Sequence, residues 1–454
     1  YINDLKEKVK TLNIRVKKSK ENLEQIRFLI NKWLHIPLFS RKEFGENNFF
    51  NEDMMDKFKM DRYSGIKEVA IDIECLLKNT EECFQIHKRI KPTSRRWRSY
   101  LRHVDGIVSE ALLWTISSSV GYLLDQTDIN KEVSPLFGIQ LELFHPDIIF
   151  RPSLDENKAN NFLDFCKQIL DDIYHMADLV PRIAQDQEDK RSYLELAMEH
   201  EELSELRSTF LSRVSLVTSQ AREEQEKYNC YSNIWTDSRQ EFMFYFLKFS
   251  RVLDDEEKYK FSEDETLVKK ELPGLPLFKE KILSYEEMYK EVLDIPKVKI
   301  YEKWLMVDQS PFRNALLHEV KRWSWIFKKH LLDEVVNSLQ DMSNFIEDSD
   351  KELAEEVEDG DYDNLIRVMR VLLSVREKQP MYDGIFEPME NTIKLLREFE
   401  VDIPEKSMQY MEKLGEKWNS TKRLAVTCKQ AVSSMLGQEV GKLTNKINKY
   451  SQDQ

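Results

Sequence analysis

A chain of 454 residues is too long for one compact core, so several domains or a stacked array of elements are expected. It contains only 11 glycines and 13 prolines, too few for the turns of an all-β protein or of many βαβ units, so the composition predicts a nearly all-α fold. The net charge of −14 disfavours general binding to nucleic acids and to anionic membranes.

The sequence also indicates the cellular compartment of the protein. No signal-peptide pattern opens the chain, and its longest uncharged run, Ala111 to Leu124, is shorter than the ~20 residues that span a bilayer. We therefore expect a soluble protein without membrane contact. Because the sequence begins at Tyr1 without Met and ends at Gln454 directly after a helical pattern, we expect both ends to continue into a larger protein. Scattered cysteines without a Cys-x-x-Cys pair predict reduced thiols in the cytoplasm: Cys75, Cys83, Cys166, Cys230 and Cys428.

The first segment carries an unbroken 3-4-3-4 apolar spacing with Lys and Arg at other positions, which predicts one long helix. At 1.5 Å per residue this helix is roughly 50 Å long. The same pattern fits an arm of a helical bundle, which we favour, and one strand of a two-stranded coiled coil. The residues in the spacing are Ile2, Leu5, Val9, Leu12, Val16, Ser19, Leu23, Ile26, Ile30 and Trp33.

Two further long helices are expected next. One runs from about Glu52 to Ile90 and completes an N-terminal bundle over residues 1–90. The other runs from Thr93 to Asp125, after Pro92, and opens a central domain of helical bundles over residues 91–252. That domain continues with helices expected at 155–180 and 191–228.

A short β element interrupts the central helices. Residues 136–144 and 147–151 flank His145-Pro146 and form a small hairpin-like insertion near 136–151. The alternation of Ile139, Leu141 and Leu143 turns one apolar face of this element toward neighbouring helices.

A linker or hinge is expected at 253–277, where an acidic stretch is followed by Leu-Pro-Gly-Leu-Pro. C-terminal bundles then occupy 278–454. Their long amphipathic helix begins at Ser310-Pro311, with proline in the first turn, after an extended or irregular stretch at 298–307. The remaining helices are expected at 278–293, 361–378, 384–399 and 405–450. The predicted fold class is all-α, an elongated array of stacked helical bundles with one small β insertion.

No catalytic, cofactor-binding or metal-binding residue is predicted. Gly437 to Leu443 approaches a phosphate-binding loop but is one residue short and has Leu in place of the Mg²⁺-binding hydroxyl. His318-Glu319 starts a helical zinc motif that fails because Arg322 replaces the second His. The acidic run Glu347–Asp363 lacks the spacing of a calcium loop, so we expect a solvated connection between helices.

One basic stretch contrasts with the acidic background. Residues from Lys88 to Arg102 contain no acid, and Trp97 and Tyr100 lie among the basic side chains. Nucleic-acid binding needs this mixture of residues, but we favour a solvated or internally paired helix face, with contact to an acidic neighbouring chain as the second interpretation. The basic members are Lys88, Arg89, Lys91, Arg95, Arg96, Arg98 and Arg102.

The order and spacing of short segments over about three hundred residues carry a resemblance to one family. They are Gly121–Asp125, Pro135–Leu143, Asp171–Tyr174, Leu179–Arg182, Arg239–Phe242, Tyr301–Leu305, Asp308–Phe312, Lys321–Ser324, Phe327–Leu331, Gly360–Tyr362, Arg376–Gln379, Ile385–Pro388 and Glu416–Asn419. From about Arg95 to its end, the chain resembles the tail of axonemal dynein heavy chains, the outer-arm beta type above all, just upstream of the linker.

The resemblance implies a scaffold without chemistry of its own. The parent heavy chain would be an ATP-driven, minus-end-directed microtubule motor of the axoneme in cilia and flagella, with its ATP and Mg²⁺ sites outside this sequence. This segment would hold the outer arm on the doublet. The implied partners are other heavy-chain tails, dynein intermediate and light chains, and docking elements of the doublet. A free-standing helical tether or adaptor without a motor is the alternative.

Overall fold

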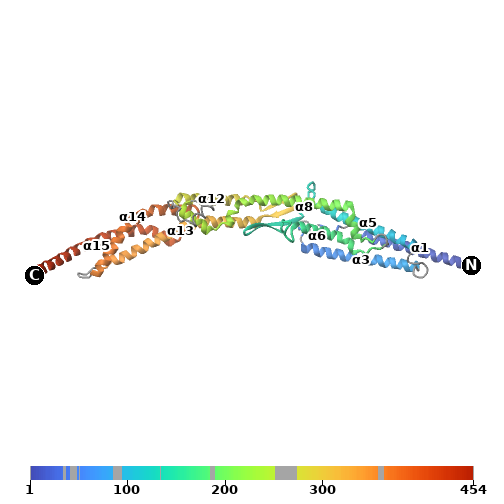
Figure 1. Ribbon diagram of the computed structural model, residues 1–454, viewed down its shortest axis with the longest axis horizontal. Coiled ribbons are helices and arrows are strands. Elements are labelled where there is room, and N and C mark those ends of the chain that lie inside the picture. The colour runs from blue at the N-terminus through green and yellow to red at the C-terminus, as the bar shows by residue number, and fades with distance from the viewer. Residues whose placement is uncertain are drawn as a thin grey trace. The chain divides into compact units, whose positions relative to one another are not determined.

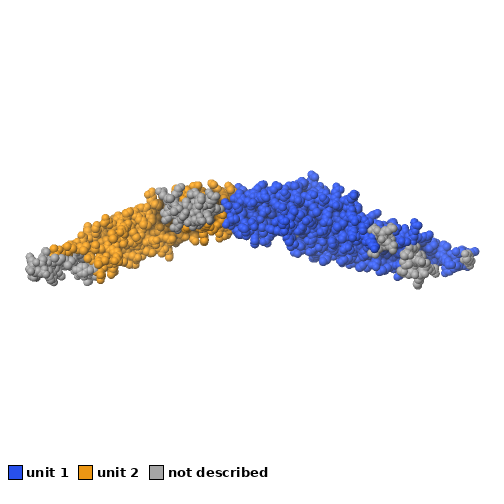
Figure 2. All heavy atoms as spheres, in the orientation of Figure 1, with its two compact units in different colours: residues 1–236, 293–316 blue, residues 237–292, 317–454 orange. Residues whose placement is uncertain are grey.

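The structure, a computed structural model, describes residues 2–33, 37–40, 49–50, 52–84, 95–132, 134–184, 190–250, 273–355 and 362–452 (Figure 1). The chain divides into two compact units, coloured separately in Figure 2. Unit 1 comprises Tyr1–Thr236 and Leu293–Leu316, and unit 2 comprises Asp237–Val292 and Leu317–Gln454. The sequence-based division into 1–90, 91–252, 253–277 and 278–454 is finer and stays a prediction.

Unit 1 is built mainly from long helices. The first helix is confirmed as α1, and it packs against α3 and α5. The described helices of this unit are α1 (Ile2–Asn31), α3 (Glu52–Phe84), α5 (Arg95–Gln126), α6 (Phe162–His175), η1 (Met176–Leu179), α7 (Tyr193–Glu199), α8 (Glu201–Lys227), η2 (Tyr228–Tyr231) and α9 (Asn233–Thr236).

Two helices differ from their predicted extents. The helix predicted over 155–180 begins only at Phe162, because the Asn161 side chain caps the Asp164 N–H and starts α6 there. The helix predicted over 191–228 is two helices. His200 is extended (φ −74°, ψ 117°) and separates α7 from α8, while a capping box between Ser192 and Glu195 fixes the start of α7.

Helix α5 is the central helix of unit 1. It packs against α1, α6 and α8, and its buried residues recur on one side from Val104 to Leu123. Among the described helices, α5 has the length and apolar composition to cross a membrane. A core helix meets the same criterion, and the burial of Val108, Ile116 and Val120 accounts for the composition.

The predicted hairpin is confirmed and forms part of a larger sheet. Strands β1 (Phe137–Phe144) and β2 (Asp147–Arg151) pair antiparallel, and Ile139 and Leu141 are buried as expected. The stretch 298–307, which the sequence predicted only as extended or irregular, contains β3 (Val298–Tyr301) and most of β4 (Leu305–Asp308). The sheet order is β2-β1-β4-β3, with β1 and β4 parallel.

The β3–β4 turn joins the two parts of unit 1. The Trp304 N–H donates to the Tyr301 carbonyl at 3.2 Å, and both central residues are left-handed, Glu302 at φ 46° and Lys303 at φ 65°. The Trp304 carbonyl accepts from the N–H groups of Leu136 and Phe137, and its buried ring meets the Phe137 ring edge-on. This turn therefore holds β4 alongside β1.

Unit 2 contains long helices around two cores. An aromatic core surrounds Phe246, Phe278 and Phe327, and an extended core runs from Val335 to Val432 around Trp418. Its helices are α10 (Arg239–Phe249), α12 (Leu275–Leu293), α13 (Ser310–Ala354), α14 (Tyr362–Glu398) and α15 (Glu405–Gln452); α12 and α13 each have an end in unit 1. The predicted start at Ser310-Pro311 is confirmed.

The separate helices predicted at 361–378 and 384–399 are wrong. Helix α14 is continuous and contains Pro380 and Pro388. Both prolines are exposed, whereas Tyr382 and Met389 on the opposite side are buried in the core. Burial of that face offsets the hydrogen bonds that the prolines remove.

The described part confirms an all-α fold with a small β insertion. The hinge expected at 253–277 lies outside the described residues up to position 272, as do residues 356–361 of the acidic run.

Candidate interaction surface

The residues that the sequence offered as candidates for nucleotide or calcium binding lie in ordinary helices where the structure describes them. Gly437 and Gly441 lie within α15, where backbone N–H groups are engaged in the helix. In the acidic run, Asp350 accepts a hydrogen bond of 2.7 Å from the Thr421 hydroxyl and ties α13 to α15. Among the described residues, no group of three or more His, Cys, Asp or Glu side chains could hold a metal ion.

The failed zinc motif has a structural role in unit 2. The His318 side chain is 71% exposed, whereas Glu319 is nearly buried and forms an ion pair with Arg239 of α10. Arg322 approaches the same carboxylate at 3.0 Å. Burial raises the pKa of Glu319, but the two guanidinium groups outweigh burial and hold it below its ordinary value. Glu319 therefore ties α10 to α13.

A second buried carboxylate, in unit 1, was not identified from the sequence. Asp105 of α5 accepts hydrogen bonds from the Tyr193 hydroxyl at 2.6 Å and the Ala184 N–H at 3.2 Å. Arg182 lies 2.9 Å from its other oxygen and stacks over the Tyr193 ring. The one signal in the sequence is an acid between apolar residues that face the core, Val104 and Val108.

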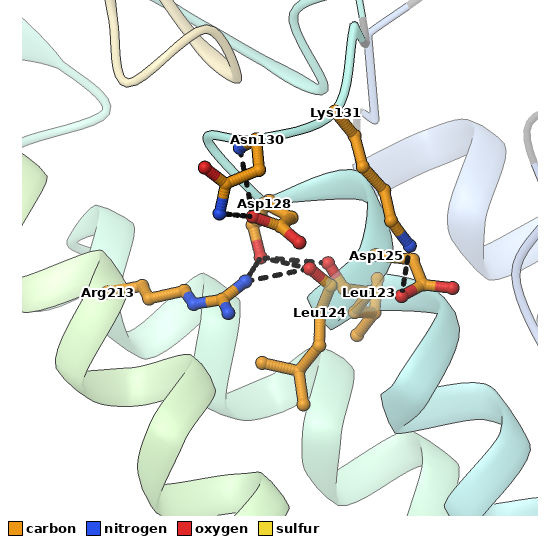
Figure 3. A network of polar contacts seen from close by, with 8 residues as sticks. Leu123, Leu124, Asp125, Asp128, Asn130, Lys131 and Arg213 are labelled. Atoms are coloured by element: carbon orange, nitrogen blue, oxygen red, sulfur yellow. Dashed lines mark hydrogen bonds and ion pairs between the residues drawn. The ribbon is translucent and has the colours of Figure 1, made fainter.

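The C-terminal end of α5 carries a polar network that was not predicted from the sequence either (Figure 3). Arg213 of α8 donates to the Leu124 carbonyl at 2.7 Å and to the Thr127 hydroxyl at 3.2 Å. A cation at this position interacts favourably with the last carbonyls of the helix and with the negative end of its dipole. In the same network, the Asn130 N–H donates to Asp128 and lowers the pKa of that carboxyl.

The basic stretch is described from Arg95 onward and lies in the first turns of α5. Arg95, Arg96 and Arg98 are exposed, and the rings of Trp97 and Tyr100 stack at 5.4 Å. The first turn of α5 contains no acid, so positive charge accumulates at the positive end of the helix dipole. This end of unit 1 can attract acidic groups.

The same end of unit 1 exposes apolar side chains. The first half of α1 leaves Ile2, Leu5, Val9, Leu12 and Val16 in solvent, while the second half buries Ile26 and Ile30 against the other helices. Basic and apolar groups are thus exposed together, a combination suited to binding another protein rather than to catalysis.

Comparisons with known proteins cover the whole chain. No protein-family model matches it. It is similar to the ciliary dynein beta chain of Heliocidaris crassispina, 35% identical over 453 residues, which are 99% of this chain and 10% of that protein. It is also similar to dynein axonemal heavy chain 17 of Homo sapiens, 32% identical over 450 residues, again 99% and 10%.

A more distant relative is the flagellar outer-arm dynein beta chain of Chlamydomonas reinhardtii, 23% identical over an alignment of 491 positions that covers 100% of this chain and 10% of that protein. The similarity extends over the first 94 residues as well, further than the motifs indicated. The chain spans about one-tenth of the length of the curated relatives it matches.

Proposed function

Because the chain belongs to the dynein heavy-chain family and corresponds to one segment of those proteins, we propose that it is a structural segment of an axonemal heavy-chain tail. In this role it anchors and assembles the outer dynein arm of cilia and flagella. The observation that carries the proposal is the match of 99% of this chain to a ciliary dynein beta chain at 35% identity.

The described structure supports a scaffolding role. Helices α13 (45 residues) and α15 (48 residues) are each about 70 Å long at 1.5 Å per residue. Buried ion pairs and hydrogen bonds tie neighbouring helices together, as Glu319 ties α10 to α13 and Asp350 ties α13 to α15. Long helices with such lateral connections suit a part that bears load.

The proposal includes the parent protein. The intact heavy chain is an ATP-driven, minus-end-directed microtubule motor in the axoneme, and its ATP and Mg²⁺ sites lie outside this segment. The segment contributes no catalytic residue and needs no cofactor. Its partners are other heavy-chain tails, dynein intermediate and light chains, and docking elements of the doublet, with no nucleic acid or membrane among them.

Mass-spectrometric peptide mapping of the native polypeptide tests the assignment to a motor. We expect peptides beyond Gln454, including Gly-x-x-x-x-Gly-Lys-Ser/Thr sequences that bind nucleotide phosphates. A native chain without such sequences would contradict a motor parent and favour the free-standing tether.

Deletion of this segment from the native chain tests the anchoring role. We expect cilia that lack outer arms, while the ATPase activity of the purified shortened protein persists. Loss of that ATPase activity, or normal arms on the doublets, would contradict a purely structural tail.

A further inference from the structure

The apolar side chains in the first half of α1 form the stripe, here called the seam, that one strand of a coiled coil turns toward its partner. The 3-4-3-4 spacing places Ile2, Val9 and Val16 at heptad position a, and Leu5 and Leu12 at position d. In parallel coiled coils, β-branched residues at a with leucine at d favour two strands over three or four. The choice of residues therefore fits the two-stranded form of a parallel coiled coil.

Nothing in the described part of the chain covers this seam. The five side chains are 69%, 46%, 54%, 54% and 40% exposed, in the order Ile2, Leu5, Val9, Leu12 and Val16. From Asn22 onward the same face of α1 is buried. The Asn22 side chain donates a 2.9 Å hydrogen bond to the Thr80 hydroxyl of α3. Figure 1 shows the first turns of α1 continuing past the ends of α3 and α5.

The flanks of the seam are basic. Positions e and g between residues 6 and 20 hold no acid. They are Lys6, Lys8, Asn13, Arg15 and Lys20. In a parallel pair of two copies, Arg15 of one helix would face Lys20 of the other, and an antiparallel pair would also place basic flanks together. Charge repulsion thus disfavours a second copy of this chain and favours a helix with acidic flanks.

The start of α5 adds positive charge beside the seam. The Tyr100 side chain of α5 lies close to Ser19 of α1 and Thr80 of α3. Further along α5, the Thr115 hydroxyl lies 3.4 Å from the Trp33 carbonyl, just after α1. The two helices α1 and α5 therefore run parallel. With the same offset along the two helices, Arg95 lies level with about residue 14 of α1, where its uncovered half ends. An acidic partner on α1 would also relieve the unfavourable placement of arginines at the start of α5.

We propose that residues 2–16 of α1 form a parallel, two-stranded coiled coil with an acid-flanked helix of another polypeptide. A helix joined to α1 by a short loop would run antiparallel, so a parallel partner points to a separate chain. This interaction goes beyond the scaffolding role, and its failure would leave that role unaffected.

A peptide-binding experiment on the 454-residue chain tests the surface. The probe is a dye-labelled peptide of four heptads with Ile at a, Leu at d and Glu at e and g, and the control peptide carries Lys at e and g. Fluorescence anisotropy at low salt should show that the Glu peptide binds at least roughly tenfold more tightly. Equal binding of the two peptides would overturn the proposal.

Substitutions in α1 locate the binding face. Leu5→Asp with Leu12→Asp should weaken binding of the Glu peptide by roughly tenfold or more, because both changes place a charge in the seam. Ile14→Asp is the matched control, since Ile14 is also exposed (60%) but lies at position f, away from the seam. Equal losses in the seam and control variants would overturn the assignment.

Charge reversal tests partner selection. Lys6→Glu with Lys8→Glu should shift preference toward the Lys peptide, whereas Lys10→Glu with Lys18→Glu, at positions b and c, should not. Sedimentation of the chain without peptide should show a monomer. A dimer that disappears with Leu12→Asp would identify a second copy as the occupant and overturn the proposal.

Cross-linking in the native assembly identifies the occupant. A photo-reactive residue at Leu5 or Leu12 of the native polypeptide should label one acid-flanked helix of another polypeptide, with the two sites in the same order along both chains. A cross-link within the same polypeptide, to a second copy, or in the opposite order would overturn the proposal.

Discussion

The Tyr193 hydroxyl donates a 2.6 Å hydrogen bond to Oδ1 of Asp105, across a separation of 88 residues. Arg182 lies 2.9 Å from Oδ2 of the same carboxylate, which is nearly buried. Burial is the largest cause that raises the pKa of the Tyr193 hydroxyl, followed by this carboxylate. The contact attaches α7 and the segment before it to the first half of α5.

Removal of either partner should destabilise unit 1. Asp105→Ala removes the nearly buried carboxylate that pairs with Arg182 and accepts from Tyr193, and it should cost about 3–5 kcal/mol of unfolding free energy. Tyr193→Phe removes one hydrogen bond to a charged group and should cost about 1.5–3 kcal/mol. Urea unfolding followed by circular dichroism measures both. Tyr410→Phe, at a more exposed tyrosine of unit 2, is the control, and an equal loss there would contradict the prediction.

Glu319 should make the stability of unit 2 sensitive to acid. Its folded pKa lies below the ordinary value of 4.5, so its stabilising contribution is present above pH 4.5 and is lost as pH falls through the folded pKa. Glu319→Gln should cost about 1–3 kcal/mol at pH 7. Urea unfolding between pH 7 and pH 3 should show that the variant lacks this part of the acid sensitivity.

The neighbouring histidine provides a matched control for that measurement. His318 lies on the same turn of α13, and its side chain is 71% exposed. Its Nδ1 is 3.9 Å from the Glu319 carboxylate and forms an ion pair only when the imidazole is protonated, so His318 serves as a control at pH 7. His318→Gln should change the unfolding free energy at pH 7 by no more than about 0.5 kcal/mol. A Glu319→Gln curve parallel to that of the original chain across the acid range would show that the ion pair does not contribute.

Periodicity predicted the long helices because each buries one apolar stripe. The spacing from Ile2 to Trp33 predicted α1, and Ser310-Pro311 predicted the start of α13. The break predicted between 378 and 384, where Pro380 lies, is wrong, since sequence gives no information on the packing that outweighs the hydrogen bond that a proline removes.

Contacts between distant residues could not be predicted. The parallel pairing of Phe137 with Leu305 joins strands far apart in the sequence, and β4 on its own is too short to predict. The partners of Asp105 and Arg213 lie on distant segments of the chain, so one sequence cannot pair them. The basic start of α5 was visible in the sequence, but its position beside the uncovered seam of α1 required the structure.

Arg213 should stabilise the end of α5. Arg213→Lys keeps the charge but cannot reach the Leu124 carbonyl and the Thr127 hydroxyl with the same planar group, so it should cost about 1–2 kcal/mol. Hydrogen exchange measured by mass spectrometry should be faster in the last turn of α5 than in the original chain.

Lys131→Ala is the control for the Arg213 variant. Lys131 pairs with Asp125 at 2.7 Å in the same turn region, but both side chains are largely exposed. An exposed pair of this kind contributes about 0–1 kcal/mol. If the control accelerated exchange as much as Arg213→Lys, the capping of α5 by Arg213 would not account for its stability.

The β3–β4 turn should tolerate glycine and reject a β-branched residue. Lys303 has φ 65°, where glycine has no steric cost and valine is strongly disfavoured. Lys303→Gly should therefore change the unfolding free energy by no more than about 1 kcal/mol, whereas Lys303→Val should cost about 1–3 kcal/mol. Urea unfolding of the two variants measures the difference.

Substitution of Trp304 should destabilise unit 1 more than substitution of Lys303 in the same turn. Its buried ring contacts Phe137, and its carbonyl accepts from the N–H groups that begin β1. Trp304→Ala should cost about 3–5 kcal/mol through loss of core contacts. Hydrogen exchange should also become faster at Leu136 and Phe137, since the cavity loosens the turn that receives their hydrogen bonds. Unchanged exchange there would show that β1 is held without the turn, by β2 and the helices.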